Sequence, residues 1–107
     1  MIFNLIKIIY LVLFLFSLNI NTLKADSKME MGLDVYNNKA MCGACHTLSA
    51  TGSAGEIGPN LDQAKPEIPR IIYVVTNGMG VMPAFEGILT FKEIEAVAYF
   101  VSTSSNK

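Results

Sequence analysis

The sequence of 107 residues contains no tryptophan, a single histidine and only two cysteines. A structural zinc site usually takes four cysteine or histidine ligands, so three such residues are too few for one. Charged residues make up 16% of the chain and form no basic run that would favour a nucleic acid or an anionic membrane surface. We find no internal repeat. At this length the chain forms one small domain at most.

The N-terminal segment, residues 1–25, differs from the rest of the chain. Residues 1–20 are almost wholly apolar, with Lys7 and the amino terminus as the early positive charges. The mostly apolar stretch that follows Lys7, residues 8–20, is shorter than the roughly 20 residues that a membrane-spanning helix needs. Polar residues follow. This layout predicts a secretory signal peptide that is cleaved after Ala25.

Leu23 occupies a position where a small residue is preferred before cleavage, so an uncleaved membrane anchor formed by residues 1–25 stays open as an alternative. In either case we expect residues 26–107 to be exported to the periplasm. Loss of Lys7 and Lys24 with the leader reduces the eight basic residues to six, against nine acidic residues. The exported domain is therefore mildly acidic, and a domain this small often needs a cross-link or a cofactor to complete its core.

Both cysteines and the histidine fall within one pentapeptide, Cys42-Gly43-Ala44-Cys45-His46. C-x-x-C-H is the attachment signature of a c-type haem, since two thiols at this spacing can add to the two vinyl groups of one porphyrin. The adjacent imidazole would then be the proximal ligand of the iron. A thioredoxin-like C-x-x-C belongs beside a βαβ pattern, and none follows here. The pentapeptide thus predicts one covalent haem c, with Cys42 and Cys45 as thioether anchors and His46 as iron ligand.

Two segments carry start signals for helices. Residues 27–30 read Ser-Lys-Met-Glu, a capping box, and predict a helix that begins there and ends at Asn37-Asn38. Residues 90–93 read Thr-Phe-Lys-Glu, a second capping box, and open a helix with an apolar stripe that reaches Val101. Residues 46–60 are rich in glycine, serine and threonine and read as an irregular loop.

The segment from Arg70 to Val75 is ambiguous. Its β-branched residues favour a strand on propensity alone. Pro69, however, suits the first position of a helix, and Gly78 suits the position just after its end. Both interpretations remain open from these residues.

The ligand at the sixth coordination position decides what a covalent haem can do. Three methionines are poor candidates because they lie in the first predicted helix or directly beside the first cysteine: Met29, Met31 and Met41. Residues 77–85 hold two more, Met79 and Met82, in a segment that glycines and a proline bend into a loop. Such a loop can wrap around a haem and present a thioether to the iron.

The chain resembles the small class I c-type cytochromes over nearly all of residues 26–107. The resemblance rests on short motifs that occur in the family's order: a first helix with Gly32 and Tyr36, the CGACH pentapeptide, Gly58-Pro59-Asn60-Leu61, Met82-Pro83-Ala84-Phe85 and a last helix with Ala98-Tyr99. Each motif is weak alone, whereas the whole ordered series is specific.

The resemblance implies an all-α cytochrome c fold, with about three to five short helices wrapped around one covalently attached haem and with residues near 70–77 helical. It implies His46 and Met82 as the two iron ligands, Met82 being favoured over Met79. Pro59 would offer its carbonyl to the other imidazole nitrogen of His46.

Two further contacts follow from the same resemblance. Gly32 would lie where the first and last helices cross, near Tyr99. Arg70 would either pair with a haem propionate or be a solvated surface residue.

Ligation by histidine and methionine leaves no open position on the iron, so the resemblance implies one-electron transfer and no enzymatic activity. We expect a monomeric periplasmic carrier that serves redox partner proteins, such as membrane or periplasmic oxidoreductases and oxidases of a respiratory chain. Partners would meet the exposed haem edge near Ala40-Met41 and residues 81–84. Membrane contact is expected only if the leader stays attached, and nucleic acid is not expected as a partner.

Two other functions remain alternatives. The first is a dedicated cytochrome subunit of a dehydrogenase complex, which uses the same chemistry. The second is a haem sensor or peroxidase in which Met82 dissociates, although a peroxidase needs distal histidine or arginine groups and the chain has no second histidine.

Overall fold

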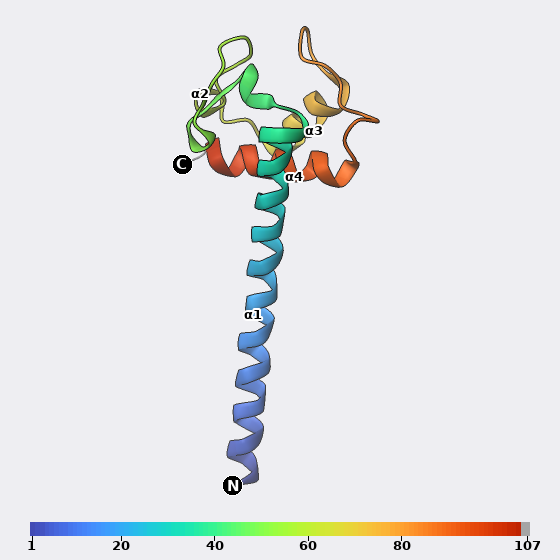
Figure 1. Ribbon diagram of the computed structural model, residues 1–107. Coiled ribbons are helices and arrows are strands. Elements are labelled where there is room, and N and C mark those ends of the chain that lie inside the picture. Colours follow the sequence, from blue (N-terminus) through green and yellow to red (C-terminus); the bar gives the residue numbers. More distant parts are fainter. Residues whose placement is uncertain (106–107) are drawn as a thin grey trace.

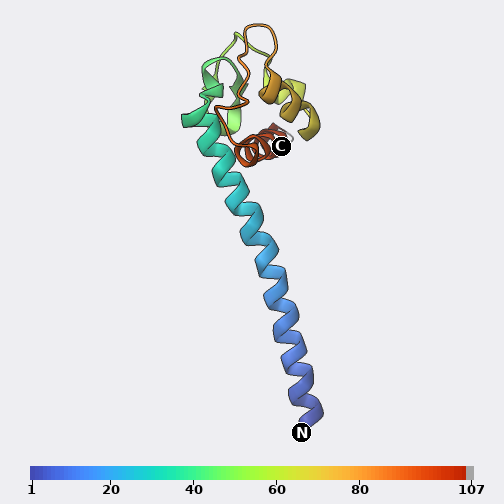
Figure 2. The same cartoon turned by 90° about the vertical axis from the view of Figure 1, so that its right-hand side faces the viewer.

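The computed structural model describes residues 1–105, apart from the side chains of residues 18–22. One long helix, α1 (Ile2–Asp34), joins at its C-terminal end a small head that all later elements build (Figure 1). Figure 2 shows the first part of α1 projecting alone from this head, which gives the molecule extents of 68 × 29 × 21 Å.

The head consists mainly of helices. After α1 the chain forms a π-helical turn η1 (Val35–Lys39), a 3-10 turn η2 (Cys42–Ala44), strand β1 (Thr47–Leu48), a 3-10 turn η3 (Ser49–Thr51), strand β2 (Ser53–Ala54), and helices α2 (Leu61–Ala64), α3 (Ile68–Asn77) and α4 (Phe91–Ser105). The expectation of an all-α fold is confirmed. The small departure from it is the antiparallel pair β1–β2, which lies inside the segment predicted as an irregular loop.

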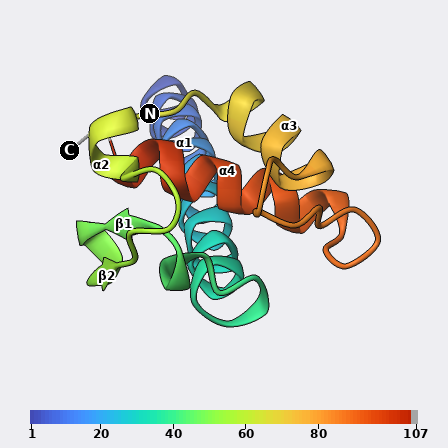
Figure 3. The same cartoon turned by 90° about the horizontal axis from the view of Figure 1, so that it is seen from above.

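Helix α4 crosses the end of α1, as Figure 3 shows from above. The two helices meet at Gly32, where an added Cβ would lie 2.3 Å from the carbonyl oxygen of Ala96 and 2.5 Å from the Cβ of Phe100. The predicted crossing at Gly32 is therefore confirmed, and the atoms nearest to an added Cβ belong to Ala96 and Phe100. Residues three apart on a helix are neighbours on one face, so Tyr99 lies on the same side of α4 as Ala96 and faces the turn of α1 that precedes Gly32. Its ring lies 5.4 Å from the Nζ of Lys28.

The prediction that a helix begins at Ser27 is wrong. Residues 27–30 lie inside α1, which is already helical from Ile2 onward. A capping box acts only where the chain enters a helix from a non-helical conformation. The helix was expected to end at Asn37-Asn38. The α-helix ends at Asp34 and passes directly into the π-helical turn η1, which ends at Lys39. The capping box at residues 90–93 is confirmed: the Glu93 N–H donates to Thr90 Oγ1 at 3.2 Å, and the Thr90 N–H donates to Glu93 Oε1 at 3.0 Å.

The segment left ambiguous by the sequence is the helix α3, so the strand alternative is wrong. Pro69 lies in its first turn and Gly78 caps its end with a φ of +74°. Ile71 and Val75, four residues apart, are buried on the face that packs into the core. The buried face explains why the segment is a helix and not a strand, because residues four apart lie on one side of a helix and can pack into the core together.

The first part of α1 carries exposed apolar side chains along its whole length. They include Ile2, Phe3, Leu11 and Phe16. Within the part of the chain whose side chains are described, no helix is both long enough and apolar enough to cross a bilayer. The helix runs without a break through Ala25, and cleavage after that residue stays a prediction.

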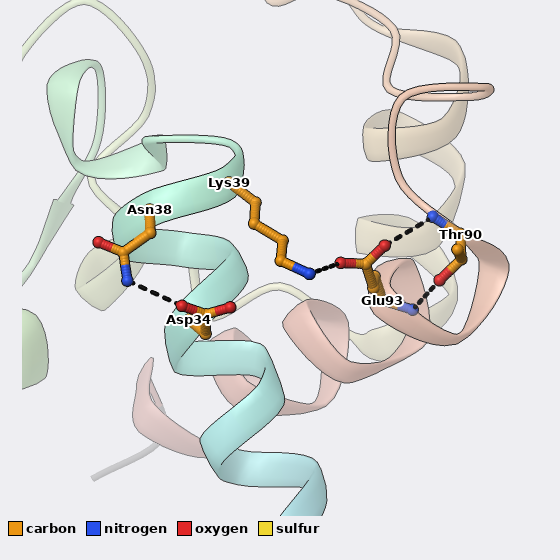
Figure 4. A network of polar contacts seen from close by, with 5 residues as sticks. All are labelled: Asp34, Asn38, Lys39, Thr90 and Glu93. Carbon is orange, nitrogen blue, oxygen red and sulfur yellow. Dashed lines mark hydrogen bonds and ion pairs between the residues drawn. The ribbon is translucent and has the colours of Figure 1, made fainter.

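An ion pair joins the turn before the haem motif to the start of α4 (Figure 4). Lys39 Nζ donates to the carboxylate of Glu93, which also accepts the Thr90 N–H at 3.0 Å. These two donors hold the pKa of Glu93 at about 2, well below its ordinary 4.5. On the neighbouring turn, Asn38 Nδ2 donates to Asp34 Oδ1 at 2.8 Å.

We expect this ion pair to make stability depend on pH in the acid range. A carboxyl whose pKa is lower in the folded state stabilises that state above its unfolded pKa, and the contribution is lost as pH falls through the folded pKa. The free energy of unfolding should therefore decrease between about pH 4.5 and pH 2. Glu93→Gln should flatten this part of the curve, measured by denaturant unfolding of the haem-loaded protein at a series of pH values. Glu95→Gln on the same helix is the control, and parallel curves for wild type and Glu93→Gln would contradict the assignment.

Candidate haem-binding site

The head encloses a cavity of about 890 Å³ whose walls are mostly apolar. The lining comes from the turns η1 and η2, from helices α2, α3 and α4 and from the segments that connect them. It includes Cys42, Cys45, His46, Gly58, Pro59, Arg70, Met79, Met82, Phe85 and Val97. Ligand sites are typically of this size and have mostly apolar walls with a few placed polar groups. The haem predicted from the pentapeptide suits a cavity with this mostly apolar lining.

Both cysteines of the pentapeptide line this cavity as free thiols. The turn η2 presents them, since the N–H groups of Cys45 and His46 both donate to the carbonyl of Cys42, at 3.1 and 3.0 Å. Met41, just before the turn, adopts a left-handed conformation with a φ of +51°. Burial raises the pKa of the Cys42 thiol to about 11, so this side chain is a neutral, largely desolvated group. One tight turn thus places both attachment thiols and the imidazole at one wall.

The imidazole of His46 is held by a backbone carbonyl. Its Nδ1 lies 2.7 Å from the carbonyl oxygen of Pro59. A carbonyl only accepts hydrogen bonds, so Nδ1 must carry the proton in this contact, and the lone pair of Nε2 is left for a metal. The contact that the resemblance implied for Pro59 is present. Its role toward an iron ligand remains a prediction, as does ligation by His46.

Gly58 lets the chain pass directly against that imidazole. A Cβ at this position would lie 2.5 Å from Cε1 and 2.9 Å from Nδ1 of His46, closer than real Cβ contacts. The Gly58 N–H donates to the carbonyl of Cys45 at 2.7 Å, which ties this loop to the pentapeptide. Gly58 was identified from the sequence only as part of a motif. The need for a glycine there was not predictable, because it comes from a contact between two separate segments of the chain.

Met79 and Met82 both line the cavity from the segment between α3 and α4. Their backbones pair across a tight turn: each N–H donates to the other residue's carbonyl at 3.0 Å. Gly80 begins the turn with a φ of +58°. The structure thus brings both candidate thioethers to the site that holds His46, and it does not by itself choose between them.

Arg70 is another cavity-lining residue, and it projects from the first turn of α3. Its Nη2 lies 3.6 Å from the Sδ of Met79. Within residues 1–105 the guanidinium forms no ion pair with a carboxylate. The sequence reading considered a propionate or solvent as its partner and missed the methionine, which lies nine residues away and on a different segment.

Comparisons with known proteins agree with this geometry. Residues 27–101 match the family model described as cytochrome C oxidase, cbb3-type, subunit III. Cytochrome c6 of Leptolyngbya boryana is 36% identical over 80 residues, which cover 71% of this chain and 92% of the relative. The chloroplastic cytochrome c6 of Chlamydomonas reinhardtii is 36% identical over 83 residues, and this chain spans only 52% of its length.

A solved structure supports the same likeness in three dimensions. The crystal structure of the c-type cytochrome SorU from Sinorhizobium meliloti superimposes with a TM-score of 0.72 at 46% sequence identity. The match covers 77% of this chain and 95% of that one. The likeness therefore extends over most of this chain and nearly all of the solved one.

Proposed function

Because the chain belongs to the small class I c-type cytochromes, we propose that it is an exported carrier that passes one electron at a time between redox partner proteins. The cofactor of this family is a covalently attached haem c, and Cys42 and Cys45 fit its attachment motif. The observation that carries the proposal is that His46 and two methionine thioethers line one apolar cavity. Ligation by the imidazole and one thioether would leave no open coordination position on the iron.

The residues of the site would act on the iron as follows. The haem supplies exchange of one electron between Fe(II) and Fe(III). Pro59 holds Nδ1 of His46 and so orients the imidazole and increases its basicity. Met82 would supply a weak thioether donor, which would favour Fe(II) and raise the reduction potential. The apolar lining excludes water and disfavours the additional positive charge of Fe(III), so it acts in the same direction.

Export is proposed from the leader. Residues 1–25 have the layout of a signal peptide, and the apolar side chains of their described part point into solvent instead of packing on the head. A contiguous exposed apolar surface is unusual unless the segment is removed or covered. The head does not depend on this segment for its core, so cleavage after Ala25 would leave the site intact.

Partner proteins would meet the apolar rim of the cavity. Four large apolar residues of the lining are exposed: Met41, Ile57, Met79 and Val81, the last to 85%. Short-lived redox complexes bury little surface, on the order of 1,200 Å² or less, so a small apolar rim suits such a contact. An apolar edge with few charges favours contacts that form and separate quickly.

Optical spectra of the oxidised and reduced protein test the proposal. We expect the reduced spectrum of a thioether-attached low-spin haem, the weak charge-transfer band of iron–methionine ligation in the oxidised protein, and no binding of carbon monoxide to the reduced protein at neutral pH. Carbon monoxide binding would instead indicate an open coordination position and a sensor or peroxidase. Loss of the charge-transfer band in Met79→Ala alone would show that Met82 is not the ligand.

A further inference from the structure

Met79 and Met82 occupy paired positions on the two sides of one turn. In an antiparallel pair that exchanges both backbone hydrogen bonds, the two side chains emerge on the same face, with Cα atoms about 5.5 Å apart. Both bonds of this pair are present at 3.0 Å, and both side chains line the same cavity. A single iron site therefore has two thioethers within one short turn.

The backbone of the turn is held on both sides, so the two methionines stay on the same face of it. Gly78 packs against its far end, where an added Cβ would lie 2.8 Å from both Met82 O and Ala84 N. Beyond the turn, the Phe85 N–H donates to the carbonyl of Val75 at 2.9 Å. Exchange between the two sulfurs on the iron would therefore rely on rotation of the two methionine side chains.

The surroundings of the two methionines differ. Met82 is partly buried and packs against the hydrophobic core, whereas Met79 is 50% exposed. Arg70 Nη2 donates to Met79 Sδ at 3.6 Å, which draws this sulfur toward the rim. A thioether is a weak acceptor, so the contact restrains Met79 without immobilising it.

We propose that Met79 is a reserve iron ligand, which the Arg70 guanidinium holds at the rim while Met82 occupies the site. The proposal rests on the proposed function, since it presumes that a thioether is the sixth ligand. It assigns Arg70 a positioning role, because the residue acts on the iron only through Met79.

Three haem-loaded variants test the reserve ligand: Met82→Ala, Met79→Ala and the double variant. We expect Met82→Ala to keep the iron–methionine charge-transfer band and a ring-shifted methionine methyl signal in the reduced protein, and the double variant to lose both. If Met79 occupies the position for about 90% of the time, Met82→Ala should bind carbon monoxide about tenfold more weakly than the double variant. Met82→Leu, which keeps the apolar volume, replaces Met82→Ala if that variant does not fold.

The outcomes separate this inference from the proposed function. A Met82→Ala protein with the spectrum and carbon monoxide affinity of the double variant overturns the reserve ligand and leaves Met82 as the sixth ligand. Loss of the band in Met79→Ala alone overturns the assignment of Met82 itself, and with it the inference.

Substitution of Arg70 tests the restraint. In Arg70→Leu we expect a second set of ring-shifted methionine signals, because release of Met79 raises a minor state from a population below detection toward about 10%. Arg70→Lys is the matched control, because it keeps the positive charge but lacks the planar guanidinium. We expect its Met79-ligated minor state to be less populated than that of Arg70→Leu. A single set of signals in Arg70→Leu, at the wild-type positions, overturns the role of Arg70.

Discussion

Replacing both cysteines by alanine should leave a chain that does not fold cooperatively. The haem cavity has a volume of about 890 Å³ in a head of roughly 80 residues. At about 24 cal/mol per Å³ an empty cavity of that volume would cost roughly 20 kcal/mol. The cavity is open on one side, so that figure is an upper bound, yet even part of it is comparable with the roughly 5–15 kcal/mol that stabilises a typical domain.

Circular dichroism and one-dimensional proton NMR of the double variant Cys42→Ala/Cys45→Ala test whether it folds cooperatively. We expect reduced helix content, no sharp thermal transition and poorly dispersed signals. The single variants are the controls, because each keeps one thioether and both iron ligands and should remain folded with lower stability. A double variant that unfolds in one sharp transition would show that the core is complete without the haem.

The haem motif was predictable because its parts are adjacent. Cys42, Cys45 and His46 occupy one turn, η2 and the residues just after it, so their spacing alone describes the geometry. The residues alone narrowed the second ligand to Met79 and Met82, and only the family resemblance favoured Met82. That Met82 and His46 line one cavity depends on how the loop after α3 folds back, and no local pattern encodes that.

Local signals failed where another part of the chain decided the conformation. The capping box at Ser27 is a genuine pattern, yet the residues before it are already helical and α1 runs through. In α3 the β-branched residues favour a strand, and burial of Ile71 and Val75 on one face overrides that preference. The π-helical turn η1 had no recognisable signal in the sequence.

Contacts between distant segments were the least predictable part of the site. Gly32 was correctly placed at the helix crossing, but its tightest contacts, with Ala96 and Phe100, were not predicted. The contact of Arg70 with Met79 joins a helix to a loop and leaves no trace in composition or periodicity. Such contacts depend on packing within a few tenths of an ångström, which the sequence alone does not specify.

Gly58→Ala is expected to disturb the iron site more than any other change outside the iron ligands and the attachment cysteines. Its Cβ would lie 2.5 Å from His46 Cε1, so either the imidazole or the loop with Pro59 must move. Overpacking of this kind costs about 1–3 kcal/mol, and loss of the His46–Pro59 hydrogen bond adds about 1 kcal/mol. We therefore expect denaturant unfolding of the haem-loaded variant to show a loss of about 3 kcal/mol.

The same substitution should raise the reduction potential. A histidine ligand that loses the acceptor on Nδ1 becomes a weaker donor, and a weaker donor stabilises Fe(III) less. A tenfold loss of relative affinity for Fe(III) corresponds to about 59 mV for one electron. Gly52→Ala is the control in the same loop, because its Cβ meets no atom within 4 Å and only its φ of +72° is strained. Gly52→Ala should lower the free energy of unfolding by about 1 kcal/mol and leave the reduction potential unchanged. A Gly58→Ala protein with wild-type stability and potential would mean that the imidazole does not lie against Gly58 in the haem-loaded protein.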